Sequence, residues 1–198
     1  MSFITFIYKL SNYFFEISKE SAFLLASGIV YDTAHLRNAN LKTFEILTEL
    51  LKKSEREFSE ILDLLRTRTD ISEKIANLKA ISRLRSYRIG DVLVSFTNAG
   101  SFEASVARNL LRSGSDIAIV AAPRKKSLRI SGRMKSYLRD KINLAEIFSD
   151  IEKIIDGSAG GHDMAASANG KKPDKIGEAF KKILSSIENK LGEKSKQL

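Results

Sequence analysis

The stretch that decides the fold runs Gly157-Ser-Ala-Gly-Gly161-His162-Asp-Met-Ala-Ala-Ser-Ala168. It is built almost entirely of glycine and other small residues, and it follows an apolar segment with helical spacing at 144–155. Glycines let backbone N–H groups approach an anion closely, and a histidine beside them can donate a hydrogen bond to it. The stretch predicts a glycine-rich turn between a helix and a strand, with Gly160, Gly161 and His162 as candidate binding residues. An ordinary turn with a structural histidine is the alternative.

Strands and helices alternate on both sides of this turn, from residue 90 onward. Runs of β-branched and apolar residues predict strands at 91–97, 116–122 and 128–131, with a hairpin at 123–127. Helical spacing predicts helices at 102–111 and 144–155, the first capped by Ser101. Pro173 opens a last amphipathic helix, whose charged end at 190–198 is expected to fray. This order is typical of a small α/β domain with a mixed sheet.

The first 85 residues have a different pattern, which is helical almost throughout. Apolar residues recur at helical spacing in 3–16, 22–30, 41–65 and 71–84. We therefore expect an α/β protein of two domains: a helical part at 1–85 and a mixed-sheet part at 86–198.

Basic residues are concentrated in one part of the chain, whose formal net charge is +9. Thirteen Lys and Arg but only three acids lie between Lys79 and Arg139. Because clusters of Lys and Arg bind phosphates and release counterions, a polyanion is the predicted partner. A basic surface that only increases solubility is the alternative.

Several classes of site are excluded by composition. The absence of cysteine excludes disulfides, thiolate zinc sites and a cysteine nucleophile. His35 and His162 are the only histidines, so a multi-histidine metal site is excluded as well. The apolar amino-terminal residues lack the pattern of a signal peptide and are too short a run to span a bilayer. We expect a soluble, cytoplasmic protein with no membrane partner.

Two motifs together resemble a known family. Residues 160–167 are similar to the Gly-Gly-His-x-x-Ala-Ala-Gly signature of the C-terminal domain associated with DHH phosphoesterases, with Ser167 in place of the last glycine. Ser131-Gly-Arg133 precedes His162 by 29 residues, where that family carries a Ser-x-Arg motif on a strand. The order of elements, from the basic strand to the helix opened by proline, resembles that domain too.

The amino-terminal part resembles the same family. Residues 25–36, LASGIVYDTAHL, are similar to the fourth motif of the DHH domain, an apolar helix running into Gly-Ile-x-x-Asp-Thr. The resemblance makes Asp32 the candidate for a vestigial manganese ligand, with His35 nearby. A helix-end carboxylate that caps backbone N–H groups is the alternative for Asp32.

The motifs that would form the rest of the family's metal site are missing. The sequence holds no Asp-x-Asp and no Asp-His-His. Two hard cations need several carboxylates, which one aspartate cannot supply. The chain therefore resembles a truncated RecJ-like protein, with the end of the DHH domain and the associated C-terminal domain, and we expect no catalysis, no metal and no cofactor.

The resemblance implies a module that binds single-stranded nucleic acid. The predicted binding residues belong to the two motifs and to the basic segment around them: Arg129, Ser131, Arg133, Gly160, Gly161 and His162, with Lys125 and Lys126. Tyr137, Phe96 and Phe102 are the nearest aromatic residues for stacking.

Short archaeal RecJ-like proteins serve the replication fork, so the resemblance also implies GINS and the MCM helicase as partners. An apolar face at 3–16 (Phe6, Ile7, Leu10, Phe14) is expected to need cover from the chain or from such a partner. The first alternative is a manganese-dependent phosphoesterase or exonuclease acting on oligonucleotides, whose catalytic half comes from another chain or is missing from this sequence. The second is a decayed, poorly folding product.

Overall fold

The computed structural model describes residues 17–66 and 70–198. The predicted helix at 3–16, with Phe6, Ile7, Leu10 and Phe14, lies outside the described residues. The chain divides into two compact units between Arg68 and Thr69. The sequence predicts a boundary after residue 85, whereas α5 (Ile71–Ile81) belongs to the second unit together with β1 (Arg85–Ile89), which follows it.

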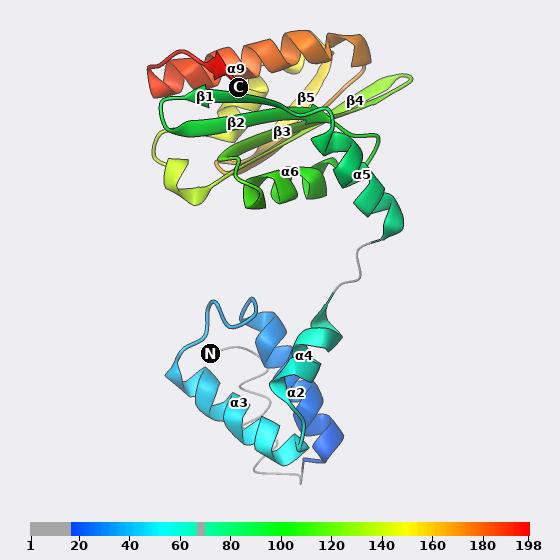
Figure 1. The fold of residues 1–198 in the computed structure, drawn as a ribbon, viewed down its shortest axis with the longest axis vertical. Coiled ribbons are helices and arrows are strands. Elements are labelled where there is room, and N and C mark those ends of the chain that lie inside the picture. The colour runs from blue at the N-terminus through cyan, green and yellow to red at the C-terminus, as the bar shows by residue number, and fades with distance from the viewer. Residues whose placement is uncertain (1–16, 67–69) are drawn as a thin grey trace. The chain divides into compact units, whose positions relative to one another are not determined.

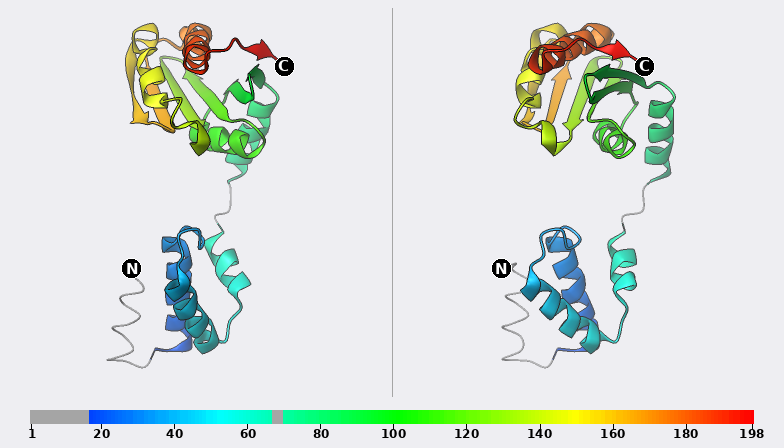
Figure 2. Two further views of the ribbon diagram at one scale, coloured as in Figure 1. Left: turned by 90° about the vertical axis from the view of Figure 1, so that its left-hand side faces the viewer. Right: turned by 60° about the vertical axis from the view of Figure 1, so that its left-hand side comes forward.

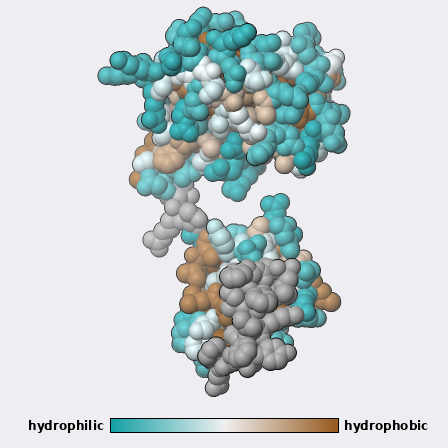
Figure 3. All heavy atoms as spheres, turned by 180° about the vertical axis from the view of Figure 1, so that it is seen from behind, coloured by the Kyte–Doolittle hydropathy of each residue, from teal (hydrophilic) through white to brown (hydrophobic). Residues whose placement is uncertain are grey.

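The first unit holds the helices α2 (Lys19–Asp32), α3 (Leu41–Ser54) and α4 (Phe58–Leu65). Ile29, Leu50 and Ile61 form the fully buried centre between them. The segment predicted as one helix at 41–65 is broken after α3, because Glu55 adopts a left-handed conformation with φ of 57°. Apolar side chains remain at the surface of this unit, as the brown spheres of Figure 3 show.

The second unit is organised by a seven-stranded mixed sheet within residues 70–198. Its strands are β1, β2 (Val92–Asn98), β3 (Ile117–Arg124), β4 (Ser127–Met134), β5 (Gly157–His162), β6 (Ala165–Gly170) and β7 (Lys196–Gln197). They lie in the order β5-β6-β4-β3-β2-β1-β7 (Figure 1). β2 and β3 are parallel and are joined by α6 (Glu103–Arg112), and the other pairs described are antiparallel.

Helices cover both faces of this sheet (Figure 2). On one face α7 (Leu144–Ser149), α8 (Glu152–Ile155) and α9 (Ile176–Leu191) pack on a core that includes Ile119, Ile130 and Phe148. On the other face α5 and α6 pack on Ala118 and Val120. Single 3-10 turns precede two of these segments, at Ser136–Leu138 and Pro173–Lys175. The predicted α/β class with a mixed sheet is confirmed.

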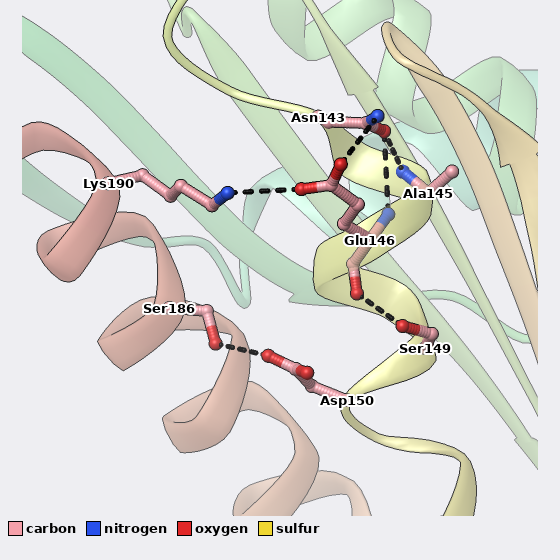
Figure 4. A network of polar contacts seen from close by, with 7 residues as sticks. All are labelled: Asn143, Ala145, Glu146, Ser149, Asp150, Ser186 and Lys190. Atoms are coloured by element: carbon pink, nitrogen blue, oxygen red, sulfur yellow. Dashed lines mark hydrogen bonds and ion pairs between the residues drawn. The ribbon is translucent and has the colours of Figure 1, made fainter.

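A polar network joins α7 to α9 on the first face (Figure 4). Asn143 caps α7 by accepting a hydrogen bond from Ala145 N at 3.0 Å. Lys190 Nζ reaches Glu146 Oε2 at 3.0 Å, and Ser186 Oγ donates to Asp150 Oδ2 at 2.8 Å. These contacts hold the carboxyl-terminal half of α9 against α7, although each exposed pair stabilises by under about 1 kcal/mol.

Three local predictions are wrong. Residues 157–162 were predicted as a glycine-rich turn, but they form the edge strand β5. They pair with β6 over their whole length, and the turn begins only at residue 163. The segment 190–198 contains β7, which pairs with Tyr87 and Arg88 of β1. α6 begins at Glu103 after Phe102, whose φ is 61°, and Ser101 does not cap it.

Among the described residues, no helix is both long and apolar enough to cross a membrane.

Candidate nucleic-acid interface

The alternation of side chains along β4 places the Ser-x-Arg motif on one face of the sheet. Ile130 and Met134 point to the core under α7 to α9, so Ser131 and Arg133 point to the opposite face, which α6 covers only over part of the sheet. Ser131 is buried and Arg133 is half-buried. The motif is thus brought to the border between the covered and the open part of this face.

The glycine–histidine motif lies beside it across β6. The pairing register sets Ser131 opposite Ser167 and Ser167 opposite Gly160, and in the next row it sets Arg133 opposite Ala165 and Ala165 opposite His162. The Ser-x-Arg motif on β4 and the glycine–histidine motif on β5 are separated by two inter-strand spacings, which is roughly 10 Å. We call this surface the basic ledge, defined by Ser131, Arg133, Ser167, Asn169, Gly160 and His162.

The outer part of the basic ledge is open. Ser167, Asn169, Gly160 and His162 are all exposed, whereas Ala166 and Ala168 between them are buried on the other face. No helix of the described residues covers these positions. Residues separated by about 30 positions in the sequence therefore form one continuous, solvent-facing surface.

Arg133 carries positive charge that is not neutralised. Its Nη1 donates to Gly132 O at 2.7 Å and to Ser131 Oγ at 3.3 Å, both neutral acceptors. Burial, and then the charge of Arg108 on α6, lowers the pKa of the Arg133 guanidinium. In residues 17–66 and 70–198 no carboxylate pairs with it, and a guanidinium has further donors to offer. The arrangement suits an anion with several oxygens, such as a phosphate.

Gly160 and Gly161 play different structural roles although they are adjacent. Gly161 has φ of +147°, and a Cβ there would lie 2.3 Å from the carbonyl oxygen of Ala165, so the hairpin itself requires glycine. A Cβ on Gly160 would meet nothing within 4 Å, and the residue faces the open side of the basic ledge. Packing within the second unit therefore does not require glycine at position 160.

A family model matches most of the second unit. The DHHA1 domain aligns with residues 90–189, which is half of the chain and includes every residue of the basic ledge. The chain belongs to the DHHA1 domain family. The predicted resemblance to the C-terminal domain associated with DHH phosphoesterases is confirmed.

Other proteins resemble the chain outside the DHHA1 domain as well. An uncharacterized protein of Methanocaldococcus jannaschii is 38% identical over 147 residues, which are 73% of this chain and 44% of that protein. An alanine–tRNA ligase of Natranaerobius thermophilus is 26% identical over 160 residues, 73% of this chain and 18% of the ligase. The crystal structure of an exopolyphosphatase-related protein from Bacteroides fragilis shares the fold with a TM-score of 0.55 at 16% identity, covering 89% of this chain and 52% of that one.

The other predicted basic residues of the DHHA1 domain lie at different distances from the ledge. Arg129 is on the same face of β4, but its Nε is paired with the buried carboxylate of Glu103 at 3.0 Å. Lys125 and Lys126 form the tip of the β3–β4 hairpin (Figure 1). The tip is roughly 20 Å along the strand from Arg133. These lysines can attract a polyanion to the domain, but the structure does not bring them to the glycine–histidine motif.

The predicted stacking residues are dispersed. Phe96 is buried in the core, Phe102 lies before α6, and Tyr137 is exposed in the turn after β4. The structure does not bring these three aromatic side chains together on the basic ledge.

Asp32 lies outside the DHHA1 domain, exposed at the end of α2. Thr33 Oγ1, and not Asp32, holds the following turn by donating to Ile29 O at 2.7 Å. Ala34, His35 and Leu36 all have positive φ there. No group of three or more His, Asp or Glu residues able to hold a metal occurs among the described residues. Within residues 17–66 and 70–198, Asp32 therefore belongs to no group of ligands of the kind that a metal ion requires.

Sequence reasoning missed two residues of this surface. Arg108 comes from α6, on another element, and only the packing of α6 against β3 and β4 brings its charge near Arg133. Asn169 could have been found, because it alternates with Ser167 along the small-residue strand.

Proposed function

We propose that this chain is a non-catalytic module that binds single-stranded nucleic acid through the basic ledge. The observation that carries the proposal is the guanidinium of Arg133, which lies near Arg108 with no paired carboxylate among the described residues. Two neighbouring cations repel each other, and a phosphate between or beside them would relieve this repulsion.

The geometry suggests how a strand would bind. Arg133 grips one phosphate, and His162, in the same row across β6, donates to a neighbouring phosphate or sugar. Gly160 lets the sugar–phosphate backbone of the nucleic acid approach the sheet, because glycine has no side chain on this face. Contacts of this kind do not read bases, so we expect little sequence preference. The similarity to an alanine–tRNA ligase, whose name states a tRNA substrate, supports a nucleic-acid partner.

The test is the binding of a labelled single-stranded oligonucleotide to the whole chain across a salt series, with manganese present. We expect Arg133→Ala and His162→Ala each to weaken binding about tenfold, and Arg133→Ala, which removes a cation, to reduce the salt slope by about 1 as well. Lys153→Ala is the control, because Lys153 is an exposed cation on α8, on the other face. An absence of binding at low salt, or equal losses in all three variants, would contradict the proposal.

We further propose that the module serves archaeal replication as an accessory subunit that contacts GINS and the MCM helicase. Support comes from the RecJ-like motif pattern and from the 38% identity to a Methanocaldococcus jannaschii protein. Pull-down with the tagged chain from an archaeal lysate should recover GINS or MCM subunits. Recovery of no replication protein, with the chain monomeric in solution, would count against this role.

A manganese-dependent phosphoesterase acting on oligonucleotides is the second candidate. It is favoured by one observation: the chain corresponds to only 44% of the length of its Methanocaldococcus relative, so a larger protein of this kind has room for a catalytic half. Release of nucleotides in the binding assay, dependent on manganese and abolished by Asp32→Asn, would establish it in place of the non-catalytic module.

A further inference from the structure

A cleft lies at the other end of the sheet, between β1 and α9. It has a volume of about 570 Å³, within the range typical of small-molecule sites. Its main lining residues come from three distant parts of the chain: Arg83, Arg85, Phe96, Gly177 and Phe180. A smaller hollow of about 130 Å³ continues it along α9 toward Lys181 and Leu184 and shares four of those residues. We call the two together the β1–α9 cleft.

The floor of the β1–α9 cleft is aromatic. Phe96 is buried, with its ring 5.0 Å from that of Phe180 and 5.8 Å from that of Tyr87 between centroids. Phe180 and Tyr87 are only half-buried, so parts of their rings face the cleft. A Cβ at Gly177 would meet nothing within 4 Å, which leaves open space over the first turn of α9. A planar ring can lie in this space against Phe180.

The rim of the cleft is basic. Arg83, Arg85 and Lys181 line it, and no acidic residue does. Arg83 donates to the neutral Asn98 Oδ1 at 3.2 Å, and in the described part of the chain none of the three cations pairs with a carboxylate. By contrast, Lys175, Lys182, Lys190 and Lys194, on or beside the same helix, all form ion pairs. Of the three lysines of α9, Lys181 is therefore the one without an ion pair within the described residues, and it lines the cleft.

The place of the cleft in the fold also suits a ligand. It opens at the carboxyl end of β2, whose parallel partner β3 is reached through the crossover helix α6. Ligands of open α/β sheets bind beyond the carboxyl ends of such strands. The strands β3 and β4 separate the cleft from the open part of the basic ledge, and the cleft lies on the face that α9 covers.

We propose that the β1–α9 cleft binds a nucleotide, with its base against Phe180 and its phosphate held by Arg83 and Arg85. An aromatic floor beside unpaired guanidinium groups matches a ligand that is planar and apolar at one end and anionic at the other. The nucleotide is either free or one unit of a single strand. This site is distinct from the basic ledge, so the inference does not depend on the function proposed above.

The experiment is a titration of the whole chain with AMP, followed by NMR of the backbone amides. We expect saturable binding in the range of about 0.1–1 mM, since few contacts are made. The largest shifts should fall at Gly177 and Phe180, with Gly160 and His162 unmoved. The double variant Arg83→Ala/Arg85→Ala should weaken binding tenfold or more, and Phe180→Leu, which keeps an apolar side chain in the core, about fivefold.

Two controls and a second probe make the outcomes distinct. Lys182→Ala, in which a paired lysine of α9 is removed, and Arg133→Ala on the ledge should leave AMP binding unchanged. Thermal unfolding of each variant identifies any that fails to fold. If AMP does not bind but the cleft variants weaken the binding of a single-stranded oligonucleotide, the ligand is a nucleotide within a strand.

The proposal is overturned if the cleft variants change neither AMP nor oligonucleotide binding. It is overturned as well if inorganic phosphate binds as tightly as AMP, or if the AMP shifts fall on the basic ledge and vanish with Arg133→Ala.

Discussion

The two ends of the sheet in the second unit carry candidate sites that are built in opposite ways. At the β5 end, the basic ledge comes from two short motifs on neighbouring strands, and it includes no Phe or Tyr side chain. At the β1 end, the β1–α9 cleft comes from three segments, and its floor is aromatic. The ledge is an open surface that suits a chain of phosphates, whereas the cleft encloses space for a single planar group.

A site can be recognised in a sequence only where its residues lie close together along the chain. Four of the six ledge residues (Gly160, His162, Ser167 and Asn169) lie within one hairpin, so their composition already groups them in the sequence. The cleft depends on the pairing of β1 with β2 and on the position of α9. Both belong to the tertiary structure, so the sequence alone does not reveal the cleft. We therefore expect the hairpin end of the sheet to be rigid and the β1 end to depend on β7, the strand beside β1.

The largest expected effect on stability is that of Gly161→Ala. The new methyl group would overlap the carbonyl oxygen of Ala165, and alanine resists a φ of +147°. We expect the free energy of unfolding to fall by about 1–3 kcal/mol, measured by urea denaturation. A variant as stable as the unmodified chain would show that the hairpin tolerates a side chain, and the glycine would then be explained by ligand contact alone.

A smaller effect is expected at the β1 end, where Glu188 holds the segment that leads into β7. Its carboxylate accepts a hydrogen bond from Ser195 N at 2.9 Å and pairs with Lys194 Nζ at 3.1 Å. The hydrogen bonds of Ser195, and then that of Lys194, lower the pKa of Glu188 from 4.5 to about 2. Because the folded pKa is lowered, the stabilisation is fully present above pH 4.5 and is lost as the pH falls toward 2.

We therefore expect Glu188→Gln to lower the free energy of unfolding by about 1 kcal/mol at neutral pH, since charge-assisted hydrogen bonds are replaced by neutral ones. The difference from the unmodified chain should shrink as the pH is lowered through that window. Amide hydrogen exchange at Leu198, whose N–H donates to Ser86 O at 2.9 Å, should report the release of β7. Glu193→Gln, at an exposed carboxylate nearby, is the control, and an equal effect there would refute a specific role for Glu188.

Much of the fold was predictable because it follows from the spacing of apolar residues within single helices and strands. The strands β2, β3 and β4 and the helices α6 and α9 follow from apolar periodicity, since each buries one face on the sheet. β1 was missed because Arg85, Ser86 and Arg88 resemble the basic helix before them and strand pairing alone makes them extended. β7 was missed because two residues carry no periodicity, and Glu188 holds the segment beside them.

The candidate site was predictable in part for the same reason. Ser131 and Arg133 were identified by the resemblance to the family's Ser-x-Arg motif, and His162 by the glycine-rich run beside it. The register of β4, β6 and β5 places the three in neighbouring rows. The pairing of Arg129 with Glu103 could not be read from the sequence, because 26 residues separate the two and only the packing of α6 brings them together. A count of basic residues therefore overstates the charge that the ledge can offer to an anion.

The smallest expected effect on stability, and the sharpest test of the ledge, is that of Gly160→Ala. Its Cβ would enter open space on the solvent side, so the free energy of unfolding should change by less than about 0.5 kcal/mol. If a strand lies across the ledge, the methyl group occupies the space that its backbone needs, and oligonucleotide affinity should fall about fivefold, or about 1 kcal/mol. Fluorescence anisotropy and urea denaturation on the same preparation separate the two quantities. If Gly160→Ala leaves oligonucleotide affinity unchanged while Arg133→Ala still weakens it, the nucleic acid lies nearer to Arg108 and α6 than to β5. The binding surface would then end at β6.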